Sequence, residues 1–175
     1  MPDSWTGNDH FFIEDVKKYT PMTALDVGVG HGKVGRLLFE TMEGKCHIEG
    51  IEVYPPYLAQ KVLYVYYKRI HEMDVVDWMQ QNVDWQKDLV VFGDVLEHLT
   101  YSNAISILHQ TMYRAKLVAV FTPMAYLQNS LEGNKHEAHR CSLKLQDFAS
   151  FNVLHYVNEP MGTLGLQYVL MKGFV

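Results

Sequence analysis

Short apolar runs alternate with amphipathic stretches along the chain, and this alternation predicts strands separated by helices. Several of the apolar runs end at glycine or proline, as strands buried inside a sheet commonly do. We expect strands at 23–27, 47–53, 69–73, 88–92, 117–121, 151–157 and 166–171. We expect helices at 33–42, 57–69, 75–82, 100–113 and 142–150.

Local signals support several of these assignments. In 33–42, apolar residues recur at the spacing of one helix face. Pro55 and Pro56 end the strand at 47–53, and proline suits the first turn of the helix that follows. The polar stretch 124–141 has no clean period, and a loop of this length in a compact domain is usually functional or disordered.

These elements predict an α/β fold: a seven-stranded, mostly parallel sheet with helices on both faces. The last two strands have only a short connection, which predicts an antiparallel edge strand. Trp5, His10, Phe11 and Phe12 precede the first strand, where we favour a helix packed on the sheet over a segment that closes on a ligand. Ligands of such sheets bind beyond the carboxyl ends of the strands.

Composition and charge fit a single domain over 1–175. Of the 175 residues, 48% are hydrophobic, so we expect a packed core and not a disordered chain. The formal net charge is -5 and no basic run occurs, which argues against a nucleic-acid partner.

The cysteines and the lengths of the apolar runs indicate the cellular compartment in which we expect the protein. Cys46 and Cys141 form neither a zinc pattern nor a disulfide framework, so we expect free thiols in a reducing compartment. No N-terminal targeting pattern is visible, and no apolar run approaches the roughly twenty residues that span a bilayer. We therefore expect a cytoplasmic protein with no membrane partner.

The strongest chemical signal is the glycine-rich turn from Asp26 to Gly32, directly after the first expected strand. Such a turn lets a ligand approach the backbone closely, and the following helix presents free N–H groups. A nucleoside-triphosphate loop is a poor match, because three residues separate Gly28 from Gly32 and Lys33 precedes Val34, with no hydroxyl for magnesium.

A dinucleotide-binding turn matches better but leaves Asp26 unexplained. The stretch from Gly30 to Gly35 fits G-x-G-x-x-G, and Glu52 follows about twenty residues later. However, the first glycine after the strand is Gly28, and in that register Lys33 occupies the third glycine position. An acid before the turn would repel a pyrophosphate, whereas it would suit the ammonium and sulfonium of S-adenosylmethionine.

The motif Asp26-x-Gly28-x-Gly30-x-Gly32 resembles the first motif of the class I S-adenosylmethionine-dependent methyltransferases. Further segments resemble that family, and in part its small-molecule branch, in the same order. They are Ile51-Glu52-Val53, Met73-Asp74-Val75, Asp88 to Leu99 and Thr122-Pro123. The likeness covers 24–123 and weakens beyond it. There the segment from Gly133 through Arg140 to Phe148 resembles a lid found in some members, although Cys141-Ser142-Leu143 departs from that lid's pattern.

The resemblance implies a Rossmann-like fold, S-adenosyl-L-methionine as cofactor, and roles for several residues. Glu52, next to Val53, would bind the ribose hydroxyls, unless it is a solvated acid at a strand end. Asp74 would accept from the adenine amine while the backbone near Val75 meets the ring. Its rival is Asp77. Asp94 would border the methionine part or the substrate, or instead cap the next segment.

Methyl transfer to an oxygen usually needs a general base, and histidine suits that task. His98, just past the fourth expected strand, is the first candidate, although a packing role is equally consistent with the pattern. His139 in the long loop is the second candidate. The spacing of His136 and His139 could suit a metal, but no third ligand is evident from the sequence, so we expect none.

The sequence therefore predicts an enzyme that transfers a methyl group to a small-molecule or sugar-like acceptor, more readily at oxygen than at nitrogen. A NAD-dependent oxidoreductase and a non-catalytic cofactor-binding or scaffold module are the alternatives. A second copy, in a homodimer, is a further option for completing the pocket.

Overall fold

The computed structural model describes residues 6–124, 126–131, 133–161 and 164–175, so Trp5 lies outside the described part. Seven strands form one sheet in the order β3-β2-β1-β4-β5-β7-β6. All neighbouring pairs are parallel except the two that involve β7, which runs antiparallel between β5 and β6. The strands are β1 (Thr23–Val27), β2 (His47–Glu52), β3 (Arg69–Glu72), β4 (Lys87–Gly93), β5 (Ala115–Met124), β6 (Asn152–Met161) and β7 (Leu164–Lys172).

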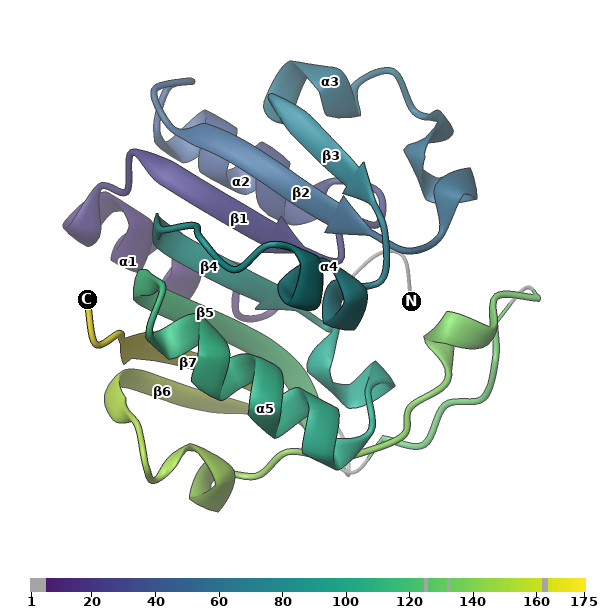
Figure 1. Ribbon diagram of the computed structural model, residues 1–175. Helices are drawn as coiled ribbons and strands as arrows, with labels where there is room; N and C mark the ends of the chain where they lie inside the picture. Colours follow the sequence, from purple (N-terminus) through teal and green to yellow (C-terminus); the bar gives the residue numbers. More distant parts are fainter. Residues whose placement is uncertain (1–5, 125, 132, 162–163) are drawn as a thin grey trace.

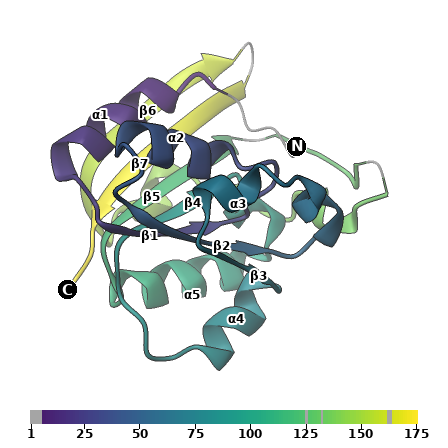
Figure 2. The ribbon, with the colours of Figure 1, turned by 90° about the horizontal axis from the view of Figure 1, so that it is seen from above.

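Helices cover both faces of this sheet, as expected (Figures 1 and 2). One face carries α1 (Asp9–Tyr19), α2 (Lys33–Thr41) and the single turn α3 (Leu63–Tyr66), and the other carries α4 (Val75–Gln81) and α5 (Tyr101–Met112). Side chains of a strand alternate between faces, so β1 contributes to two separate cores. Leu25 and Val27 face α4 and α5, whereas Ala24 faces α1 and α2.

The N-terminal segment forms the expected helix, α1. Phe12 and Val16 are buried against the sheet, where the Phe12 ring meets the Phe121 and Tyr168 rings edge-on. The Asn8 side chain, just before the helix, donates to the Leu166 carbonyl at 3.1 Å.

Two predicted helices are wrong in extent. The segment 57–69 forms only the 3-10 turn η1 (Pro55–Ala59) and α3, because Gln60 and Tyr67 are extended. This stretch is rich in β-branched and aromatic residues, which are poor helix formers. The segment 142–150 forms only the 3-10 turn η4 (Leu145–Phe148).

The strands at the antiparallel edge are longer than predicted. β5 continues to Met124, which pairs with Gly165, so β5 accommodates Pro123 near its end. The β6–β7 hairpin likewise extends past the apolar run, because backbone pairing does not require apolar side chains near the tip.

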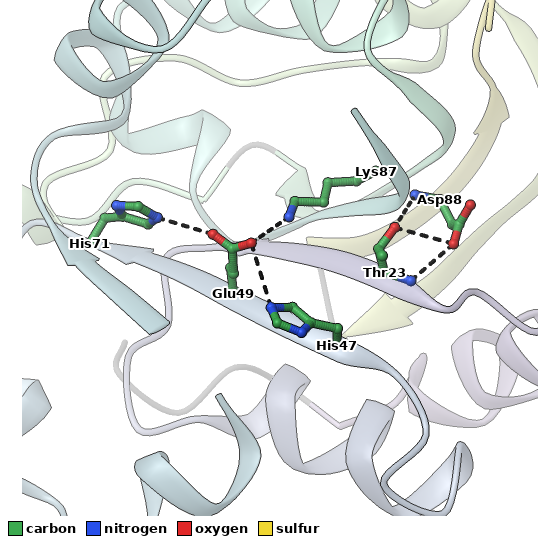
Figure 3. Close-up of polar contacts among 6 residues, drawn as sticks. All are labelled: Thr23, His47, Glu49, His71, Lys87 and Asp88. Carbon is green, nitrogen blue, oxygen red and sulfur yellow. Dashed lines mark hydrogen bonds and ion pairs between the residues drawn. The ribbon is translucent and has the colours of Figure 1, made fainter. Parts of the chain in front are cut away.

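Polar side chains tie the strands together toward their amino ends (Figure 3). Glu49 of β2 accepts from Lys87 of β4 at 2.5 Å and lies 3.3 Å from His71 of β3. On the neighbouring pair of strands, the Asp88 carboxylate accepts the Thr23 N–H at 2.9 Å, and the Thr23 hydroxyl accepts the Asp88 N–H. The polar side chains at the amino ends of these strands are thus paired with one another.

Within the described residues, no helix combines the length and apolar character needed to cross a membrane. Both cysteines are free thiols, as expected, with Cys46 buried and Cys141 half-buried.

Candidate functional site

A cavity of about 300 Å³ lies beyond the carboxyl ends of the parallel strands. The turns after β1, β2 and β4, the start of α4 and the loop around 134–140 line it. Among the residues expected to act, the cavity is lined by Gly28, Gly30, Glu52, Val53, Asp74, Val75, Asp94 and His98. Asp26, Gly32 and His139 do not line it.

The glycine turn forms the floor of the cavity. Gly28 and Gly32 have φ of +82° and +85°, which is the left-handed region that favours glycine. A Cβ on Gly28 would lie 2.2 Å from Val95 Cγ2, and one on Gly32 would lie 2.4 Å from Leu63 Cδ2. Gly28 therefore allows the fourth-strand loop to approach the turn, while Gly32 begins α2 and packs below the cavity.

Glu52 connects two loops beside the cavity. Its Oε2 accepts the Gly30 N–H at 2.8 Å, and its Oε1 accepts the Tyr54 N–H at 2.8 Å. Burial raises the pKa of Glu52 above its ordinary value, although these backbone hydrogen bonds oppose the shift. Each carboxylate oxygen has a second lone pair that can accept from a ligand hydroxyl.

Asp26 lies beneath the turn and does not line the cavity, while its expected role in cofactor binding stays a prediction. It points to the α2 face of the sheet because it alternates with Leu25 and Val27 along β1. There its Oδ2 accepts from the Tyr67 hydroxyl at 2.5 Å, and that hydroxyl accepts the Gly35 N–H at 3.0 Å. Burial raises the pKa of Asp26 to about 7, with Tyr67 opposing the shift.

At the start of α4, the two candidate acids differ in their position relative to the cavity. Asp74 lines the cavity and also caps the helix, since its Oδ1 accepts the Val76 N–H at 2.7 Å. Asp77 lies in the first turn of α4 and does not line the cavity.

The loop after β4 holds Asp94 in an unusual conformation. Its φ of +54° is uncommon for a residue other than glycine, and such backbone strain clusters at functional sites. The Asp94 N–H donates to the Phe121 carbonyl at 3.1 Å, which fixes the loop to β5. Asp94 does not cap the 3-10 turn η2 (Leu96–His98), whose N-cap is Val95 without a side-chain bond.

His98 and His139 come together, although they lie on separate segments. Their ring centroids are 4.8 Å apart with planes at 74°. Burial and the neighbouring His139 lower the pKa of His98 to about 4. His98 borders the cavity and His139 lies behind it.

The sequence did not single out the residues that bring the long loop to the cavity. Tyr57 of η1 donates to Glu137 Oε1 at 2.8 Å, and the Asn134 amide donates to the Tyr57 hydroxyl at 3.3 Å. Lys135, His136 and Arg140 of the same loop also line the cavity. Two sequence signals pointed to this wall: the polar, non-periodic character of 124–141, and the resemblance of the segment from Gly133 to Arg140 to a lid of some class I methyltransferases.

No protein-family model and no curated protein matches the chain, but solved structures do. An O-methyltransferase family protein from Burkholderia thailandensis matches with a TM-score of 0.62 and 11% identity, over 95% of this chain and 57% of that one. The N-terminal domain of EvdMO1, in the presence of SAH and D-fucose, matches with a TM-score of 0.68 and 11% identity, over 95% of this chain and 83% of that one.

A third match is the N-methyltransferase NodS from Bradyrhizobium japonicum WM9 in complex with S-adenosyl-l-homocysteine. Its TM-score is 0.66 with 11% identity, over 95% of this chain and 86% of that one. The chain has the class I methyltransferase fold. This confirms the predicted fold class and the resemblance at the level of the fold. The chain spans little more than half the length of the Burkholderia protein.

Proposed function

We propose that this chain is an S-adenosylmethionine-dependent methyltransferase that acts on a hydroxyl of a small-molecule or sugar-like acceptor. The observation that carries this proposal is the hydrogen bonding of the backbone N–H groups in the glycine turn. The N–H groups of Gly28, Val29, Gly30 and Gly32 all donate to acceptors within the protein. A pyrophosphate would need such groups free, so the turn suits a cofactor without phosphates. An NAD-dependent oxidoreductase is therefore the less favoured of the two enzyme functions.

The cavity residues suit the parts of such a cofactor. Glu52 would accept from the ribose hydroxyls through its remaining lone pairs, and Val53 follows it along the wall. Asp74 would accept from the adenine amine beside the backbone of Val75, and Asp94 would face the ammonium of the methionine part. The bound cofactor supplies an electrophilic methyl group, while the protein supplies alignment and exclusion of water.

His98 and His139 are the residues we propose for activating the acceptor, since His98 borders the cavity and contacts His139. Asn134, Lys135 and Arg140 on the same wall offer hydrogen bonds to a hydroxyl-rich molecule. Two neighbours, an O-methyltransferase family protein and a domain studied with D-fucose, support an oxygen of a sugar-like acceptor. The N-methyltransferase NodS instead supports nitrogen as the atom that accepts the methyl group.

The remaining parts of the proposal concern partners and location. The net charge of -5 supports a small-molecule partner over a nucleic acid. Two free thiols support a cytoplasmic location. The homodimer remains a prediction.

Calorimetry with S-adenosylhomocysteine and with NAD tests the cofactor. We expect binding of the first only, and at least about a tenfold loss of affinity in Glu52→Gln, whose amide would oppose a backbone N–H. Glu49→Gln is the matched control, because Glu49 lies on the same strand at the opposite end and should leave the affinity unchanged. Binding of NAD alone would contradict the proposal. S-adenosylhomocysteine binding without turnover on any hydroxyl acceptor would favour the non-catalytic module.

A further inference from the structure

A glutamate and two histidines converge at the edge of the cavity. Glu97 and His98 belong to η2 after β4, and His139 comes from the loop before η4. One ligand-type atom of each residue lies within 4.8 Å of the other two. The loop is fixed there by its backbone, because the N–H groups of Arg140 and Cys141 donate to the Glu97 carbonyl at 2.7 and 3.1 Å.

The Glu97 carboxylate is only half satisfied. The residue is 1% exposed, and its Oε2 accepts from the Thr122 hydroxyl at 3.3 Å. Among the described residues, its Oε1 has no hydrogen-bond partner. A buried carboxylate in that state is costly unless a donor or a cation meets it.

Both imidazoles are oriented by main-chain carbonyl groups. The Nδ1 of His139 lies 2.8 Å from the Tyr126 carbonyl oxygen, and the Nδ1 of His98 lies 3.4 Å from that of Ala138. A carbonyl oxygen only accepts, so Nδ1 carries the proton in each bond and the neutral ring keeps its lone pair on Nε2. Metal-bound histidines are commonly oriented by this type of contact.

We propose that Glu97, His98 and His139 bind a divalent transition-metal ion at the edge of the cavity. Two imidazoles and a carboxylate suit Zn²⁺, Mn²⁺ or Co²⁺ better than Mg²⁺, which prefers oxygen ligands. Three protein ligands leave coordination positions open. His98 borders the cavity, so an open position can face the acceptor. The sequence predicted no metal because it paired His139 with His136 and offered no third ligand. The proposed site leaves His136 out and combines His139 with Glu97 and His98 from another segment.

The metal would explain how a hydroxyl acceptor is activated, a use that rests on the proposed function. A hydroxyl bound to the ion has a lowered pKa and loses its proton to solvent. Its oxygen then forms a bond to the transferred methyl carbon. The bond between sulfur and that carbon breaks, and its electron pair stays on sulfur as a neutral thioether. Two open positions would favour acceptors with adjacent hydroxyls.

The test is calorimetric titration of the chelator-treated full chain with Zn²⁺ alone and Mn²⁺ alone. We expect one site, with affinity reduced about a hundredfold or more in His139→Ala and in Glu97→Gln. His71→Ala is the matched control, because His71 contacts a glutamate at the other end of the sheet and should leave metal affinity unchanged. Circular dichroism verifies folding. His139 lies in a loop, so His139→Ala keeps the test informative if Glu97→Gln misfolds.

Wild-type protein that binds neither ion, or His139→Ala that binds as tightly as wild type, would overturn the metal site. S-adenosylhomocysteine affinity is measured on the same samples. It should stay within about twofold in His139→Ala, since His139 does not line the cavity. Metal binding without S-adenosylhomocysteine binding would leave the metal site standing and remove the proposed function.

Discussion

Each end of the sheet holds a glutamate close to two histidines, and the two groups differ in how the carboxylate is partnered. At the amino end, Glu49 lies near His47 and His71 and accepts from Lys87 at 2.5 Å (Figure 3). Burial alone would raise the pKa of Glu49, but the hydrogen bonds from Lys87 and His71 lower it below its ordinary value. Lys87 of the protein itself therefore supplies the positive charge that this carboxylate needs.

At the carboxyl end, Glu97 lies beside His98 and His139, and one carboxylate oxygen has no hydrogen-bond partner among the described residues. Burial and the charge of Asp94 raise the pKa of Glu97 well above its ordinary value. The same residue types thus form a structural ion pair at one end and an incomplete site at the other. The difference teaches that partnering, not residue type, distinguishes a structural cluster from a candidate binding site.

The largest effect that we expect is on S-adenosylhomocysteine affinity, and it compares one glycine substitution at each end of the sheet. Gly28→Ala would place a Cβ 2.2 Å from Val95 Cγ2, a residue of the cavity wall, and should weaken S-adenosylhomocysteine binding about a hundredfold. Gly44→Ala is the control, since Gly44 has φ of +71° before β2 and its Cβ would lie 3.3 Å from Phe39. Both variants should lose about 1–3 kcal/mol of unfolding free energy. Equal loss of affinity would remove the distinction.

The second prediction concerns the pH dependence of stability. The folded pKa of Asp26 is raised from 3.8 to about 7, mainly by burial, so this acid stabilises the fold below its unfolded pKa. That contribution, a few kcal/mol, is lost as pH rises from about 4 to 7. Asp26→Asn should remove this slope in urea denaturation.

Glu49 should behave in the opposite way. Its folded pKa is lowered, so it stabilises the fold above its unfolded pKa and the contribution is lost as pH falls. Subtracting the stability of Glu49→Gln from that of wild type should give a difference that rises with pH, whereas the Asp26→Asn difference falls. Differences of the same sign would contradict the comparison.

The smallest effects are expected among the lysines of the amino end. Lys87→Met removes the partner of a half-buried carboxylate and should cost about 1–3 kcal/mol of unfolding free energy. Lys116→Met is the control, because the side chain of Lys116 is 69% exposed beside Asp88 and its ion pair should contribute less than about 1 kcal/mol. Neither variant should change S-adenosylhomocysteine affinity, which is measured by calorimetry.

The sequence predicted the layered fold because strand and helix periods are local properties of a chain. It placed Gly28, Gly30, Glu52 and Asp74 at the cavity for a related reason: each follows or ends an apolar run, and the carboxyl ends of parallel strands meet at one edge. The extent of 57–69 could not be predicted. Its extended residue Tyr67 bonds to Asp26, a contact between distant parts of the chain.

By itself, therefore, the sequence determined the order of the elements, the glycine turn and the edge of the sheet where a ligand would lie. Only the tertiary structure decided how individual polar groups are partnered. It turned Asp26 away from the cavity and brought His139 to Glu97 and His98. It also gave the N–H groups of Gly28, Val29, Gly30 and Gly32 acceptors within the protein. Hydrogen bonding and burial depend on neighbours that are distant in sequence, so periodicity and spacing do not contain that information.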